Sequence, residues 1–183
     1  KELEGIHSRT DFDLSAHEKF SGRKLQYFDP ERNENYVPYV VETSIGLDRM
    51  FLALFSICLK DEVLEDGSER TVLSLPPALA PVKAAILPLV KKDGLPEFAE
   101  KIFNDLKYDF NVISEEKDSI GKRYRRQDAI GTPFCITVDH DSLADNTVTL
   151  RERDTIKQER VKVEDLRRII DEKVNFRTLL SKI

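Results

Sequence analysis

The chain has 183 residues, of which 40% are hydrophobic and 34% charged, and its formal net charge at pH 7 is −5. This length fits one domain or one domain with part of another, and the acidic balance argues against a protein that binds nucleic acid over its whole surface. A local basic face is still compatible with this composition, because residues 118–183 carry 14 Lys and Arg against 12 Asp and Glu, whereas residues 1–117 carry 15 against 22.

The first third of the chain is predicted to contain two strands and one apolar helix. Residues 1–14 alternate loosely and predict a strand followed by a loop, and residues 15–36 predict an exposed connection that can carry a short hairpin. Pro38 stops any earlier helix, and the residues after it are β-branched and favour an extended chain. Gly46 then allows a tight turn, after which apolar residues recur at helical spacing: Leu47, Met50, Phe51, Leu54, Phe55 and Cys58.

Polar residues gather where this strand leads into the helix. Glu42, Ser44, Asp48 and Arg49 lie around the turn, and the start of a helix is suited to phosphate and ammonium ligands. The simpler alternative is an ion pair between Glu42 and Arg49, with Gly46 serving only as a helix start.

The rest of the chain predicts an α/β domain. Asp61 to Arg70 is charged and contains Gly67, and we place a domain linker there. Strands that alternate with helices after it indicate a mostly parallel sheet in two or three layers, with a hairpin near the end. The predicted strands are Val82–Leu89, Phe110–Ile113, Phe134–Val138, Thr147–Arg151 and Ile156–Val163, the predicted helices are Pro96–Tyr108, Ile120–Ala129 and Glu164–Leu180, and Asp139–Asn146 is predicted to be a turn.

One basic run is the best candidate for nucleic-acid binding. Four cations and one tyrosine between Lys122 and Arg126 can meet phosphates and a stacked base. The alternative is a solvated helix face with surface ion pairs to Asp128, Glu152 and Asp154. The candidate RNA contacts are Lys122, Arg123, Arg125, Arg126, Asp128, Phe134, Arg151 and Arg153.

Several other classes of protein and site are excluded. The longest apolar run, from Met50 to Leu59, is far shorter than the roughly 20 residues that span a bilayer, so we expect no membrane segment. Cys58 and Cys135 lie in apolar runs, which is typical of buried, reduced thiols in the cytoplasm. Neither a CxxC pair nor a His/Cys cluster at zinc spacing occurs, so we expect no metal site in this chain.

The strand–turn–helix segment resembles a known family. Glu42-Thr43-Ser44 followed by Gly46-Leu47-Asp48-Arg49 resembles motif 3 of the class II aminoacyl-tRNA synthetases, in the version of the glycyl-tRNA synthetases. Residues 2–6 and 9–14 look like the preceding strand of the same family. The second domain resembles the class IIa anticodon-binding domain in Leu75-Pro76, Ala80–Lys83, Leu87–Leu89, Ile120–Tyr124 and Ile130–Phe134.

This resemblance implies a fold and a function. Residues 1–65 are expected to be the C-terminal part of a class II catalytic domain, with antiparallel strands and the motif-3 helix. Residues 70–183 are expected to be an anticodon-binding domain with a mixed sheet flanked by helices. The implied activity is ATP-dependent attachment of glycine to tRNA(Gly) through a glycyl-adenylate, with Mg²⁺ accompanying ATP and a homodimer as the full-length enzyme.

The resemblance also assigns roles to residues. ATP is expected to meet Glu2, Leu3, Gly46, Leu47, Asp48 and Arg49, and glycine is expected to meet Glu42, Thr43, Ser44, Ile45 and Gly46. Motifs 1 and 2 are missing from this sequence, so we expect a C-terminal fragment that is inactive alone. The alternative is a non-catalytic, synthetase-like protein that binds nucleic acid or a partner, although such a protein would be expected to lose these polar residues.

Overall fold

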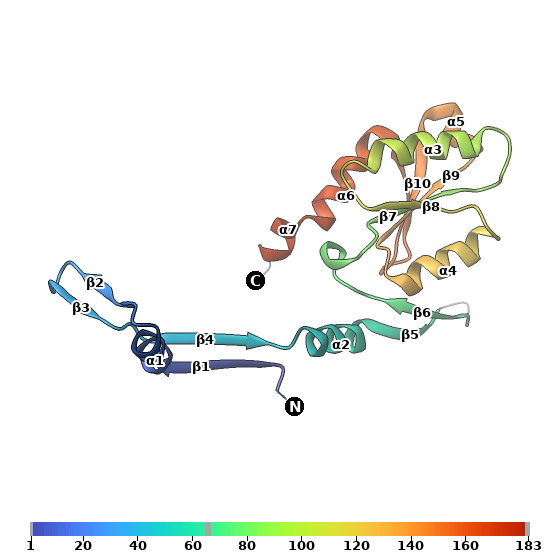
Figure 1. Cartoon of the computed structure of the whole chain (residues 1–183). Helices are drawn as coiled ribbons and strands as arrows, with labels where there is room; N and C mark the ends of the chain where they lie inside the picture. Colours follow the sequence, from blue (N-terminus) through green and yellow to red (C-terminus); the bar gives the residue numbers. More distant parts are fainter. Residues whose placement is uncertain (1, 65–66, 182–183) are drawn as a thin grey trace. The chain divides into compact units, whose positions relative to one another are not determined.

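The computed structural model describes residues 2–64 and 67–181, in two compact units, Lys1–Ala53 and Leu54–Ile183 (Figure 1). The outer limits of the two expected domains, residues 1, 65 and 183, lie outside the described residues. The division at Ala53 falls earlier in the chain than the linker expected at Asp61 to Arg70.

The first unit is built on an antiparallel pair of strands. β1 (Glu4–Thr10) pairs with β4 (Val40–Ile45), and α2 (Leu47–Cys58) begins directly after Gly46. The strand, turn and helix expected over these residues are therefore confirmed. Between the two strands the chain forms α1 (Phe12–Ser21) and a hairpin of β2 (Tyr27–Asp29) and β3 (Glu34–Tyr36).

Helix α1 replaces the loop that the sequence predicted after the first strand. Its apolar residues do not follow one stripe, so periodicity did not reveal it, and none of its residues is buried. Gly22 ends it in the left-handed conformation (φ 68°) and donates its N–H to the Glu18 carbonyl, which is a helix C-cap that the sequence does contain.

The second unit contains a five-stranded mixed sheet in the order β11–β10–β9–β7–β8. β7 (Ala84–Pro88) runs parallel to the edge strand β8 (Val112–Ser114) and to the central strand β9 (Phe134–Val138). β10 (Thr147–Glu152) runs antiparallel to β9 and to β11 (Gln158–Lys162), which forms the expected hairpin. The predicted α/β class with a mixed sheet is confirmed, and all five predicted strands are present. Two of the four strand pairs are antiparallel, so the expectation of a mostly parallel sheet is wrong.

Helices cover both faces of this sheet (Figure 1). α3 (Leu95–Leu106) and α6 (Leu166–Val174) bury apolar side chains in the main core on one face, against alternate residues of the strands such as Ile86 and Ile136. α4 (Ile120–Ile130) covers the opposite face, where Ile120 and Tyr124 pack on a smaller cluster of Ala85, Leu87 and Cys135. The unit is therefore a three-layer α/β domain.

Three segments differ from the prediction. The expected linker is a hairpin of β5 (Leu59–Val63) and β6 (Glu69–Leu73), although its residues 65 and 66 lie outside the described part. The expected turn after β9 is α5 (His140–Asp145), which Asp139 and Ser142 cap reciprocally. The expected closing helix is interrupted, because Asn175 adopts an extended conformation and caps α7 (Phe176–Leu180). Two short 3₁₀ turns, η1 (Pro77–Leu79) and η2 (Val163–Asp165), precede β7 and α6.

Gly131 ends α4 at a point where the backbone of β6 comes close. Its φ is +84°, and a Cβ built on it would lie 3.0 Å from the carbonyl oxygen of Leu73. Both features require glycine, since a side chain here would be strained and would also press on a backbone atom.

We predict that Gly131→Ala lowers the free energy of unfolding by about 2 kcal/mol, from the cost of a left-handed conformation plus the close approach to Leu73. Urea denaturation of the whole chain measures this. Gly121→Ala in the same helix is the matched control, because no atom lies within 4 Å of its Cβ position and alanine favours a helix. Equal stability of the two variants would contradict the argument.

Candidate functional site

The strand–turn–helix segment brings several predicted residues together at the start of α2. The guanidinium of Arg49 donates a hydrogen bond from Nη1 to the carbonyl oxygen of Glu2 at 2.7 Å. The N–H of Gly46 donates to the carbonyl oxygen of Leu3 at 3.3 Å. The turn after β4 is therefore fastened to the residues just before β1, as the predicted adjacency of the two segments requires.

The strand register decides which side chains share a face. In the antiparallel pair, Ser44 lies opposite Gly5 and Glu42 lies opposite His7, so these four residues are on one face of the ribbon. Thr43 and Ile45 alternate with them and project from the other face. The residues predicted to bind glycine are thus divided between two faces, with Glu42 and Ser44 side by side on one and Thr43 and Ile45 on the other.

Glu42 pairs with an arginine that the sequence analysis did not single out. Nε of Arg9 lies 3.7 Å from its carboxylate, whereas Arg49 binds the carbonyl oxygen of Glu2, so the alternative of a Glu42–Arg49 ion pair is not what the structure shows. Arg9 also makes two hydrogen bonds to Asp13, at 2.7 and 2.9 Å. These bonds raise the pKa of Arg9 and lower the pKa of Asp13. Only the pairing of β1 with β4 brings Arg9 to Glu42.

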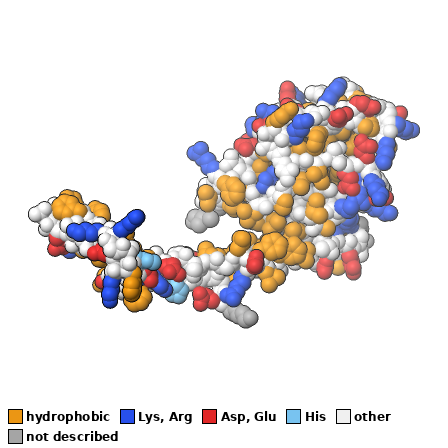
Figure 2. All heavy atoms as spheres, in the orientation of Figure 1, with side chains coloured by type: hydrophobic (Ala, Val, Ile, Leu, Met, Phe, Trp, Pro, Cys, Tyr) orange, Lys and Arg blue, Asp and Glu red, His pale blue; other side chains and the backbone are white. Residues whose placement is uncertain are grey.

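The described surface around these residues is open. Leu47 is 82% exposed, and Leu3, Ile6, Val41 and Ile45 are also exposed. Figure 2 shows hydrophobic side chains on the surface of this unit. These side chains are therefore open to solvent in the part of the unit that the structure describes.

The basic run lies on α4, but its cations have different environments. Lys122 is exposed, whereas Arg125 donates a 2.8 Å hydrogen bond to the hydroxyl of Ser68 in the hairpin. Arg126 is half-buried and pairs with Glu115 at 2.5 Å and Asp118 at 2.9 Å, and its bond to Glu115 chiefly raises its pKa. In Figure 2, basic side chains gather at the edge of the second unit where α4 begins.

The structure buries the other candidate RNA contacts inside the domain, which corrects the prediction that their side chains face RNA. Each is at most 4% exposed, so none offers a side-chain surface to a large ligand: Arg123 2%, Asp128 0%, Phe134 3%, Arg151 4% and Arg153 1%. Phe134 belongs to the main core. Arg123 lies in a basic run that looked like a solvated helix face, and the backbone carbonyls that it binds are 8 to 35 residues away. Arg151 binds Asp128 and Arg153 binds the adjacent Asp154, as the alternative of ion pairs expected, but both arginines are buried and not on the surface.

Asp128 is the centre of a buried ionic network. Both of its oxygens accept hydrogen bonds from Arg151, at 2.8 and 2.9 Å, and Oδ2 also accepts one from Arg70 at 3.1 Å. Burial lowers the pKa of Arg151, but the bonds and charge of Asp128 more than offset this, and the net pKa is raised. The guanidinium of Arg151 also lies over the ring of Tyr124, 4.8 Å from its centre.

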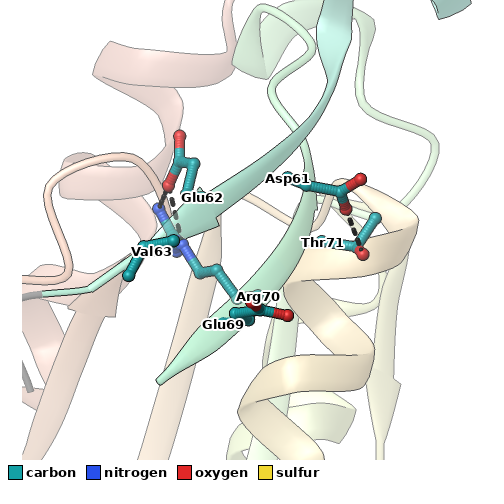
Figure 3. A pocket seen from close by; sticks show the side chains of 6 residues that line it. All are labelled: Asp61, Glu62, Val63, Glu69, Arg70 and Thr71. Atoms are coloured by element: carbon teal, nitrogen blue, oxygen red, sulfur yellow. Dashed lines mark hydrogen bonds and ion pairs between the residues drawn. The ribbon is translucent and has the colours of Figure 1, made fainter. Parts of the chain in front are cut away.

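Arg70 connects this network to the hairpin. It donates to Oε2 of Glu62 from Nε at 2.9 Å and from Nη2 at 2.7 Å, across the β5–β6 pair (Figure 3). Asp61 and Thr71 are joined by a 2.6 Å bond in the same view. These side chains, with Val63 and Glu69, line an open hollow of about 270 Å³.

Arg123 binds backbone carbonyl groups and not a carboxylate. Its guanidinium donates to the carbonyl oxygens of Pro88, Leu89 and Glu115, at 2.7, 3.2 and 3.0 Å. These carbonyls lie just beyond the carboxyl ends of β7 and β8, and the arginine satisfies them inside the protein. Burial lowers the pKa of Arg123.

The described residues show neither a metal centre nor a membrane helix. Across residues 2–64 and 67–181, no three His, Cys, Asp or Glu side chains lie close enough together to hold a metal ion. Among the helices in that part of the chain, none combines the length and apolar character needed to cross a bilayer. A Mg²⁺ ion here would have to take most of its ligands from phosphates and water.

Comparison with known proteins gives a family match within the second unit and relatives whose similarity covers both units. Residues 83–173 match the family described as "Anticodon binding domain". The chain is 57% identical to a glycine–tRNA ligase of Chlorobaculum tepidum over 161 residues, which are 88% of this chain and 34% of that protein. It is 54% identical to the glycine–tRNA ligase of Macrococcus caseolyticus, over 96% of this chain and 37% of that protein. The resemblance to the glycyl-tRNA synthetases is confirmed, and the chain spans about a third of the length of these relatives.

One solved structure has a similar fold. The RNA binding domain of threonyl-tRNA synthetase from Cryptosporidium parvum Iowa II superposes with a TM-score of 0.69 at 22% identity, over 94% of this chain and 39% of that one. At this identity the likeness concerns the fold alone.

We predict that Asp128→Asn lowers the free energy of unfolding by about 3 kcal/mol, because it leaves the buried Arg151 without a carboxylate partner and leaves Arg70 with Glu62 alone. Urea denaturation at neutral pH is the measurement. Asp118→Asn is the control, since Asp118 also pairs with an arginine of α4 but is exposed, and exposed ion pairs contribute little. Similar losses in the two variants would show that burial of the network has no special weight.

Proposed function

Because residues 83–173 belong to the anticodon binding domain family, we propose that the second unit binds tRNA at its anticodon. The carrying observation is this family match, which coincides with a basic, partly exposed helix. RNA loops are recognised by phosphate contacts together with splayed bases that stack and hydrogen-bond. Lys122, Arg125 and Arg126 are the proposed RNA contacts, since the other candidates are buried.

We further propose that the whole protein is a glycine–tRNA ligase. The support is the identity of 51–57% to eight relatives of that name over at least 88% of this chain. The activity forms glycyl-adenylate from glycine and ATP and transfers the glycyl group to tRNA(Gly). A homodimer in the cytoplasm, with Mg²⁺ accompanying ATP, belongs to the same proposal.

In this proposal residues 1–65 are part of the catalytic domain. Arg49 holds the triphosphate of ATP, since a guanidinium at the start of a helix is suited to phosphate oxygens. Glu42 accepts hydrogen bonds from the ammonium group of glycine, and Ser44 is on the same face beside it. Glu2, Leu3, Leu47 and Asp48 line the nucleotide side, and Thr43, Ile45 and Gly46 shape the glycine side. When glycine is absent, Arg9 neutralises the charge of Glu42, and glycine has to compete with Arg9 for this carboxylate.

The anticodon proposal predicts that the chain binds tRNA(Gly) more tightly than the same tRNA with a swapped anticodon. Lys122→Ala should weaken binding to both about equally and reduce the salt slope by about 0.7, the value for one phosphate contact in single-stranded RNA. Titrations at several salt concentrations measure both effects.

Lys101→Ala is the control for Lys122, because Lys101 is an exposed lysine on α3, on the other face of the sheet. It should leave affinity and slope unchanged. Equal binding of the two tRNAs, with affinity that collapses as salt rises, would mean that the basic helix makes only phosphate contacts and does not read the anticodon.

The ligase proposal predicts that Glu42→Gln in the whole protein raises the KM for glycine by about 10- to 100-fold, which corresponds to the loss of a hydrogen bond between charged groups. Glycine-dependent ATP–pyrophosphate exchange is the assay, and the KM for ATP should change little. Glu34→Gln in the β2–β3 hairpin serves as the control. Absence of exchange in the unaltered whole protein would instead favour a non-catalytic, synthetase-like protein.

A further inference from the structure

The hairpin β5–β6 contacts the proposed RNA-binding helix α4 at three points. Arg70 joins Glu62 on the hairpin to Asp128 on α4. Ser68 accepts a hydrogen bond from Arg125. Gly131, at the end of α4, lets the carbonyl of Leu73 approach closely. All three lie on the side of α4 that faces β6.

Arg153 also joins α4 to the hairpin, through the backbone at the end of each. Its guanidinium donates to the carbonyl oxygen of Gly131 at 2.7 Å and to that of Leu75 at 2.7 Å, so it joins the end of α4 to the residues that follow β6. The carbonyl of Arg153 in turn accepts a 2.9 Å bond from Arg70. The network therefore forms a closed loop of contacts through Arg70, α4 and Arg153.

This network is more than is needed to hold α4 on the sheet. On the sheet side, Ile120 and Tyr124 already pack on the cluster under the helix, and Tyr124 hydrogen-bonds to Thr137 at 2.6 Å. The ionic contacts instead fix the rotation and height of α4 relative to the hairpin. Ion pairs between forked groups have a narrow geometry, which suits them to positioning.

We propose that Arg70, with Asp128, positions the cations of α4 for RNA. The inference rests on the proposed binding of tRNA by this helix. The side chain of Arg70 is 1% exposed, so it can act on RNA only through α4 and not by touching a phosphate. The hairpin is thereby a working part of the anticodon-binding unit, although it lies outside the residues that match the family.

The test is Arg70→Met in the whole chain, which keeps an apolar stem but removes the fork. We expect affinity for tRNA(Gly) to fall about tenfold and discrimination against a swapped anticodon to shrink, with an unchanged salt slope because no phosphate contact is lost. Arg70→Lys, which keeps the charge, should recover part of the affinity. Lys122→Ala gives the opposite pattern of a reduced slope and retained discrimination.

Two controls separate positioning from stability. Ile170→Ala removes a fully buried side chain of α6 on the other face of the sheet and should destabilise the chain without changing tRNA affinity at a temperature where it stays folded. Ser68→Ala, a milder change on the hairpin, should weaken tRNA binding about twofold to threefold with an unchanged slope, and it serves if Arg70→Met does not fold. The proposal would be overturned if folded Arg70→Met kept the native tRNA affinity and discrimination. If only Ser68→Ala folds, the same result in that variant would overturn it. A loss of tRNA affinity in Ile170→Ala as large as in Arg70→Met would overturn it as well.

Hydrogen exchange without RNA distinguishes failure of this inference from failure of the proposed function. Arg70→Met should speed amide exchange in α4 while exchange in α3 and α6 stays as it was. If the unaltered chain binds tRNA(Gly) and the same tRNA with a swapped anticodon equally well, the function proposed for the domain is wrong. Unchanged exchange in α4 would then show that Arg70 does not hold the helix either.

Discussion

A carboxylate with no exposed surface determines the arrangement of the second unit. Asp128 has 0% relative exposure, and burying such a charge without partners would cost several kcal/mol. It therefore requires arginines on both sides, and they come from separate segments, Arg151 on β10 and Arg70 on β6. Satisfying one side chain brings a strand, a helix and a hairpin to one point. The hairpin is held by this requirement more than by its own short strands.

The burial of Asp128 also decides which charged side chains of α4 are buried in the domain and which remain at the surface. Along the helix, Arg123 and Gln127 are one turn apart and buried, and Tyr124 and Asp128 form the next inward row. Lys122 is left on the outer side, and Arg126 is tied to acidic residues before the helix. The run of four cations thus has three environments. Lys122 is exposed, Arg125 and Arg126 are held by neighbouring side chains, and Arg123 binds backbone carbonyl oxygens. Specific recognition benefits from such restraint, because a fixed cation loses less entropy on binding than a mobile one.

Much of this architecture could be predicted from the sequence, and the failures share a cause. The strands around Ile86 and Ile136 are continuous apolar runs, and Gly131 with Pro133 marks the end of α4, so local pattern was enough there. The hairpin at Asp61 was taken for a linker because most of its residues from Asp61 to Arg70 are charged or polar, and because Arg70, which is buried like Val72 and Leu73, is itself a cation. The burial of Arg70 depends on Asp128, which is 58 residues away, and that of Arg151 depends on a partner 23 residues away. Local periodicity contains no signal for such pairs.

The first unit shows how register restricts function even in an open ribbon. Because β1 and β4 are antiparallel, any small ligand on the face of Glu42 also meets Ser44, Gly5 and His7, and it cannot touch the side chains of Thr43 or Ile45 at the same time. Gly5 is the one buried residue of β1, and a Cβ built on it would clash with the side chains of Glu2 and His7, so this strand position accepts no side chain. The side chains of Glu2 and His7 therefore crowd the strand beside Ser44. Under the proposed function, this crowding would restrict the face to a ligand without a large side chain, as much as the charge of Glu42 would attract an ammonium group.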